Sequence, residues 1–174
     1  MGRVPHAATA LLLDWLLGEP KRRHPWSGRL ALCCERRLCG GAGVAQGARR
    51  ARGVCATLLL LAPFTAATAT LTEVPYLGTV VGVAMLYLAL GHRSLHDHAR
   101  PVAAALSARD EAEARRLVGL IVSRDPASLD ITHAATESVL ENGNDAVFGA
   151  LFWFVVAGAP GVVVYRLANT LDAM

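Results

Sequence analysis

Three long runs without a charged residue constrain this chain more than any other feature. Residues 54–71 and 74–91 each form an uncharged run of 18 residues, and residues 146–165 form one of 20. A helix needs about 20 apolar residues to cross the hydrocarbon layer of a bilayer, so each run has roughly the length of a span. The sequence therefore predicts an all-α, integral membrane helical protein with about three spans, and its 53% hydrophobic residues support this.

A fourth, shorter apolar segment lies near the amino terminus. Residues 7–17 contain Asp14 and are too few to cross comfortably. Only Arg3 precedes the segment as a positive charge, and no small-x-small cleavage pattern follows it, so it does not resemble a signal peptide. We expect a retained re-entrant or interfacial segment, with a short span as the alternative.

The distribution of charge predicts an orientation. Residues 19–53 contain nine Lys and Arg against two Glu, which places this loop in the cytoplasm and the turn at Thr72 and Glu73 outside. We expect one membrane domain, residues 1–174, in a bacterial inner membrane, with residues 92–145 as a cytoplasmic helical segment. The run at 146–165 then crosses outward or dips in. Because no aromatic residues interleave the basic ones, membrane lipid is the expected partner and nucleic acid is not.

The polar segment contains recognisable helix ends. Asp110 and Glu113 have the spacing of a capping box, and Asp130 is placed to cap the next helix. That helix is predicted to run to about Asn142, where Gly143 favours a left-handed turn that leads to Asp145.

Two glutamates share one face of this predicted helix. Glu137 and Glu141 are four residues apart, and their like charges repel. One interpretation is a solvated face, or ion pairs with nearby Arg. The other is a magnesium site, because this ion prefers a few hard oxygen ligands and leaves positions for water and phosphates.

A second polar stripe closes the chain. Arg166, Asn169 and Asp172 recur every three residues and share a helical face at the end of the third apolar run. Such side chains are costly to desolvate, so they face a polar cavity or another helix. An Arg that extends to the interface among ordinary polar neighbours is the alternative.

The polar motifs, taken in order, resemble those of a known family. They are "LLLDWLLGEPKRRHP", "RSLHDHA", "IVSRDPASLD", "ATESVLENGNDAVFGALFW" and "VYRLANTLDAM". This series is similar to that of the CobD/CbiB family, the integral-membrane adenosylcobinamide-phosphate synthases of cobalamin biosynthesis. The resemblance implies an amide ligase that joins the corrinoid adenosylcobyric acid to aminopropanol or its phosphate, using ATP and Mg²⁺.

The resemblance also implies candidate site residues. We assign magnesium binding to Glu137, Glu141 and Asp145. The expected catalytic residues are His24, Asp172 and Asn169, with His24 or Asp172 as the base and Asn169 positioning the amine or nucleotide. Substrate and phosphate binding is expected of a larger set: Asp14, Arg124, Asp125, Ser138, Asn142, Tyr165, Arg166 and Thr170. The Gly and Pro commonly found after the glutamate motif are Ala146 and Ala150 here.

Family members continue beyond the last motif, so we expect this chain to be an amino-terminal portion. Its activity would then require self-association or a carboxy-terminal partner. A non-catalytic, AmpE-like membrane regulatory protein is the main alternative function. A small transporter fragment is a further one, disfavoured because the three uncharged runs contain no ionisable group in the middle of a span.

Overall fold

A computed structural model describes residues 2–18, 46–120, 122 and 130–172. His24, Arg124 and Asp125 lie outside the described residues. Within these residues the secondary structure is helical and contains no strand, which confirms the all-α prediction. The helices are α1 (Arg3–Leu17), α3 (Gln46–Thr72), α4 (Leu77–Ala89), α5 (His92–Ser107), α6 (Glu111–Val118), α7 (Ile131–Gly143), the π-helix η2 (Asn144–Phe148) and α8 (Gly149–Asp172).

Three helical segments are long and apolar enough to cross a membrane. They are Gln46–Thr72, Leu77–Ser107 and Ile131–Asp172, which confirms the expected number of about three segments with the length and apolar character of a span. The second segment joins α4 and α5, and the third joins α7, η2 and α8. The 15 residues of α1 have a helical length of only about 22 Å, less than the hydrocarbon thickness of about 30 Å.

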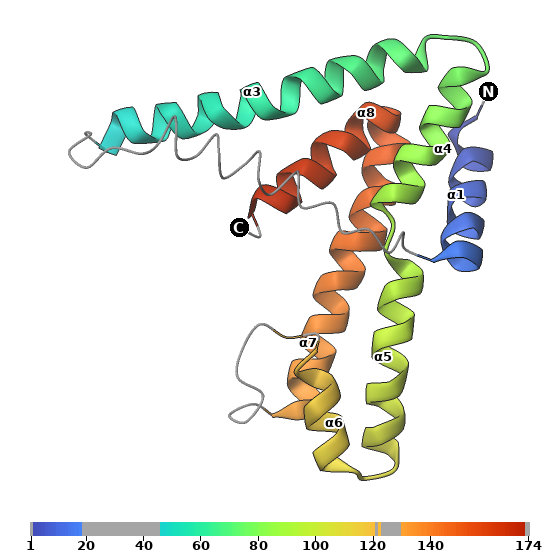
Figure 1. The fold of residues 1–174 in the computed structure, drawn as a ribbon, viewed down its shortest axis with the longest axis vertical. Coiled ribbons are helices and arrows are strands. Elements are labelled where there is room, and N and C mark those ends of the chain that lie inside the picture. Colours follow the sequence, from blue (N-terminus) through green and yellow to red (C-terminus); the bar gives the residue numbers. More distant parts are fainter. Residues whose placement is uncertain (1, 19–45, 121, 123–129, 173–174) are drawn as a thin grey trace.

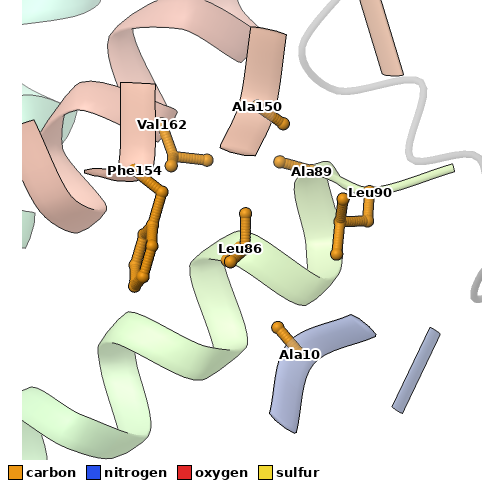
Figure 2. Packing of buried hydrophobic residues seen from close by; sticks show 7 residues of the cluster. All are labelled: Ala10, Leu86, Ala89, Leu90, Ala150, Phe154 and Val162. Carbon is orange, nitrogen blue, oxygen red and sulfur yellow. The ribbon is translucent and has the colours of Figure 1, made fainter. Parts of the chain in front are cut away.

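The first apolar core lies between α1, α4 and α8. Its buried members are Ala10, Leu86, Ala89, Leu90, Ala150, Phe154 and Val162. Figure 2 shows these side chains converging from the three helices. Alanine lets helix backbones approach closely, which favours van der Waals packing between membrane helices. The large residues Phe154 and Leu86 fill the remaining space.

The second core belongs to an arm formed by α5, α6 and α7, which extends away from the other helices (Figure 1). Both predicted helix caps in this arm are confirmed. Asp110 accepts a hydrogen bond from the N–H of Glu113, and Asp130 accepts one from the N–H of His133, each at 3.1 Å. These bonds satisfy backbone donors that the first turn of a helix leaves free. The arm corresponds to the predicted helical segment 92–145.

The left-handed turn predicted at Gly143 is wrong. Gly143 has φ −63° and ψ −43°, so the chain continues as a helix through η2 into α8, and Asp145 lies in the π-helix rather than in a turn. The physical reason is that helical hydrogen bonding continues past Gly143, since the N–H of Asn144 donates to the carbonyl oxygens of Leu140 and Glu141. A Cβ atom on Gly143 would lie at an ordinary 3.6 Å from Cδ2 of Leu95, so packing does not require a glycine at this position.

The third apolar run is bent back on itself. Gly158 has φ 71° and ψ −155°, which interrupts α8, and Pro160 follows within the same helix. The hydroxyl of Tyr165 donates to the carbonyl oxygen of Asp145 at 3.2 Å. In a straight helix these residues would be about 30 Å apart. We therefore describe α8 as a hairpin (Figure 1). Its tip is at Gly158, its two legs are the parts of α8 before and after Gly158, and its base is the region of η2 where Tyr165 meets Asp145. This is the geometry of a segment that dips into a membrane and returns.

Candidate functional site

The base of the α8 hairpin meets the junction between α4 and α5. The N–H of Gly91 donates to the carbonyl oxygen of Ala146 at 3.1 Å. A Cβ atom on Gly91 would lie only 3.2 Å from that of Ala146. The glycine therefore leaves room for the methyl group of Ala146. Through this contact the first turn of α5 is held beside η2.

Asp14 is fully buried at this junction. Its Oδ2 accepts the backbone N–H of Arg93 at 2.9 Å, and Nδ1 of His92 lies 4.0 Å from the same oxygen. Its Oδ1 is buried and finds no hydrogen-bond partner in the part of the chain that the structure describes. A carboxylate that accepts an N–H of the first turn stabilises a helix through the bond and the helix dipole. Asp14 thus links α1 to the start of α5.

Several residues beside Asp14 were not singled out in the sequence analysis. Arg93 donates from Nη1 to the carbonyl oxygen of Trp15 at 2.6 Å and from Nε to Oδ2 of Asp97 at 2.8 Å. The Trp15 ring lies 5.6 Å from the ring of His92 and 5.5 Å from that of His96. The four-residue spacings from His92 to His96 and from Arg93 to Asp97 were the available sequence indication, because such pairs are neighbours on a helix.

The predicted magnesium ligands lie along α7 and η2. Glu137 and Glu141 are exposed, whereas Asp145 is partly buried. Across the described ranges no group of three or more His, Cys, Asp or Glu side chains is placed to hold a metal ion. A magnesium ion held by one or two of these carboxylates together with substrate phosphates, a common arrangement for this ion, stays a prediction.

Two predicted substrate residues bond to one another. Ser138 is buried, and Nδ2 of Asn142 donates to its carbonyl oxygen at 2.8 Å and to its Oγ at 3.3 Å. Ser138 follows Ala134 and Ala135 on the buried face of α7. Ser138 therefore contributes to packing in the arm, and the exposed Asn142 bonds back to it.

The second half of α8 carries the remaining candidates. Tyr165, Arg166, Asn169 and Thr170 are partly buried, and Asp172 is exposed. Oγ1 of Thr170 donates to the carbonyl oxygen of Arg166 at 2.8 Å. The hydrogen bond from Tyr165 to Asp145 brings the second half of α8 back to η2. Tyr165, one residue before the arginine stripe (Arg166, Asn169 and Asp172), therefore lies beside Asp145, two residues beyond the end of the acidic helix α7 (Glu137 and Glu141).

Comparison with known proteins confirms the family that the sequence motifs indicate. A family model described as "CobD/Cbib protein" matches residues 7–174. The chain belongs to the CobD/CbiB family. A CobD/CbiB relative from Stutzerimonas stutzeri is 57% identical over 170 residues, covering 95% of this chain and 55% of the relative. One from Chromobacterium violaceum is 56% identical over 172 residues, with the same coverage.

A more distant CobD/CbiB relative, from Rhizobium meliloti, is 36% identical over 179 residues and is covered to 54% of its length. All three relatives are named "Cobalamin biosynthesis protein CobD". The chain spans about half the length of the curated relatives it matches. No solved structure matches it.

Proposed function

We propose that this chain serves cobalamin biosynthesis, in the step that forms an amide between adenosylcobyric acid and aminopropanol or its phosphate. The names of its relatives support the pathway. The observation that carries the proposal is the hydrogen bond from Tyr165 to Asp145. It brings the half of α8 that carries Arg166, Asn169 and Asp172 back toward Asp145, and ATP-dependent amide formation needs cationic and acidic groups near the same nucleotide and carboxylate.

The reaction must activate a carboxylate that is otherwise a poor electrophile. Transfer of the γ-phosphoryl group of ATP to the corrinoid carboxylate gives an acyl phosphate, and attack by the amine then releases phosphate. Bound Mg²⁺ would neutralise nucleotide phosphates, with ligands drawn from Glu137, Glu141 and Asp145. Arg166 would add a fixed positive charge, and Arg124 a second one with Asp125 beside it.

The amine must lose protons to form the amide. We assign proton acceptance to the exposed carboxylate of Asp172, with His24 as the alternative base, and orientation of the amine to Asn169. Tyr165 and Thr170 would line the same side of the substrate-binding site. Holding the amine and the activated carboxylate in contact is the largest benefit that such a site offers, since it replaces a bimolecular encounter.

One observation favours binding without turnover as a second candidate. Three predicted substrate residues, Asp14, Ser138 and Asn142, make hydrogen bonds within the fold. A regulatory protein of the AmpE-like kind would retain such internal contacts and bind a ligand without chemistry. Measuring nucleotide and corrinoid binding beside turnover distinguishes the two.

The direct test is reconstitution of amide formation. The chain, purified in detergent, is given adenosylcobyric acid, aminopropanol phosphate, ATP and magnesium, alone and co-expressed with the remainder of the Stutzerimonas stutzeri relative. We expect adenosylcobinamide phosphate only when that remainder, or a self-associated form of the chain, is present. Absence of product from the reconstituted pair, under conditions where the intact relative turns over, would contradict the proposal.

A further inference from the structure

The break in α8 lies beside Arg3. Gly158 has non-helical backbone angles, and Pro160 has no backbone N–H, so the carbonyl of Val156 has no donor four residues further on. In an apolar environment a backbone group without a partner is costly. The guanidinium of Arg3 supplies one donor, because its Nη1 bonds the carbonyl oxygen of Val155 at 2.5 Å.

The positive charge of Arg3 is also favourable at this break in the helix. Three guanidinium atoms lie 3.7 to 3.8 Å from where a Cβ atom of Gly158 would be, so the group sits directly against the hinge. A cation is favourable at the carboxyl end of a helix, where the dipole is negative. The contact joins residues 152 positions apart in the sequence.

The same short helix reaches both ends of the hairpin. Arg3, at the start of α1, contacts the hinge, and Asp14, near the end of α1, caps α5 beside the base. Figure 1 shows α1 alongside α4, with α8 on the other side of α4. The two ends of α1 therefore fix the tip and the base of the hairpin relative to each other.

We propose that Arg3 is a positioning residue, which closes the tip of the α8 hairpin and so keeps Tyr165 and Arg166 against Asp145 at its base. Gly158 is a soft hinge because glycine tolerates a wide range of backbone angles. Tyr165 is seven residues further on, about 10 Å along the helix, so a hinge change of about 15° would move it by about 3 Å. That displacement is enough to break the 3.2 Å bond to Asp145.

Distance measurements test this directly. Spin labels are placed at two exposed positions at the base of the legs, Phe148→Cys and Ala168→Cys, in the chain with its four native cysteines changed to serine and reconstituted in lipid nanodiscs. Ala168 is ten residues beyond Gly158, about 15 Å along the helix, so a hinge change of about 15° in Arg3→Gln should broaden the distance distribution and lengthen its mean by about 4 Å. Arg3→Lys, which keeps a charged donor, should restore the parent distribution.

Arg100→Gln is the matched control, because Arg100 is an exposed arginine on α5 in the arm. Its distribution should equal that of the parent. A parent-like distribution in Arg3→Gln, an equal change in Arg100→Gln, or no restoration by Arg3→Lys would overturn the proposal.

The consequence for catalysis rests on the proposed function, whereas the distances do not. In the reconstituted ligase, Arg3→Gln should lower kcat about tenfold with little change in the KM for nucleotide, because the site is misaligned rather than removed. If no amide product forms in any sample, the labelled distances still decide whether Arg3 holds the hairpin. An unchanged kcat in Arg3→Gln, with parent turnover intact, would overturn the positioning role.

Discussion

At the scale of single residues, the site depends on positions where a side chain is absent or buried. A Cβ atom on Gly149 would overlap the phenol ring of Tyr165, so this glycine lets the two legs of the hairpin meet. At Asp14 it is the side chain that matters. This buried carboxylate belongs to α1 and accepts a hydrogen bond from the start of α5. Both positions set the distance between elements.

Gly149→Ala should destabilise the protein by about 1 to 3 kcal/mol, because the added methyl group forces Tyr165 away. Gly143→Ala is the matched control. Its methyl group would meet Leu95 at an ordinary 3.6 Å, so this helical position should gain about 0.5 to 1 kcal/mol. Unfolding free energies in detergent measure both. Combining Gly149→Ala with Tyr165→Ala should remove most of the cost, and a fully additive double variant would show that the two residues do not compete for space.

Asp14→Ala should cost about 0.5 to 2 kcal/mol, as expected for loss of a side-chain acceptor in the first turn of a helix. Asp14→Asn keeps an oxygen that can accept the N–H of Arg93 and should lose less. The comparison uses thermal or denaturant unfolding of the two variants side by side. Equal losses would mean that the negative charge, rather than the hydrogen bond, is the main contribution of Asp14.

At the scale of elements, local patterns predicted helices and caps well and the path of the third run poorly. Asp110 and Asp130 cap their helices as expected because a cap depends on residues three positions away. The hairpin depends on contacts that local spacing does not reveal, namely Arg3 with Val155 and Tyr165 with Asp145.

Gly158→Ala should destabilise the hairpin by about 1 to 3 kcal/mol, because the backbone conformation of Gly158 is one that residues with a Cβ atom rarely adopt. Gly53→Ala is the control. It lies within α3, and no atom would contact its new methyl group within 4 Å, so it should be neutral or slightly stabilising. Unfolding in detergent gives both values, and a neutral Gly158→Ala would mean that the hinge relaxes into a helix without penalty.

At the scale of the whole molecule, the sequence motifs predict the candidate site only in part. The motifs identified the polar residues, and the hairpin brings Tyr165 to Asp145. Ser138 and Asn142 also bond to each other, as their four-residue spacing on a helix allows, whereas the burial of Ser138 depends on the neighbouring helices and could not be predicted from the motifs. The placement of Glu137 and Glu141 on one exposed face of α7 follows directly from their spacing.

Glu137→Gln or Glu141→Gln should weaken magnesium-dependent nucleotide binding by about 1 to 3 kcal/mol, because each removes a charged oxygen ligand while keeping the side-chain shape. Titration calorimetry with and without magnesium measures the difference. Glu111→Gln is the better control than Glu113→Gln. A hydrogen bond from Arg116 lowers the pKa of Glu113, so changing Glu113 would also disturb that ion pair. Equal losses of nucleotide affinity in Glu111→Gln and Glu141→Gln would favour the alternative interpretation, in which Glu137 and Glu141 form a solvated face of α7.

The hairpin also determines on which side of the membrane the last residues lie. Nine basic residues before the first long run predict that residues 19–53 and the arm are cytoplasmic. Because Tyr165 returns to Asp145, Ala168 should lie on the same side as the arm, whereas a straight crossing would carry it to the side of Glu73.

Single cysteines at Glu73, Arg115 and Ala168, in the cysteine-free chain, can be labelled with a membrane-impermeant maleimide in oriented vesicles. We expect Arg115 and Ala168 to react from one side and Glu73 from the other. Reaction of Ala168 together with Glu73 would show that the third run crosses the membrane and that the acidic helix and the arginine stripe do not share a site.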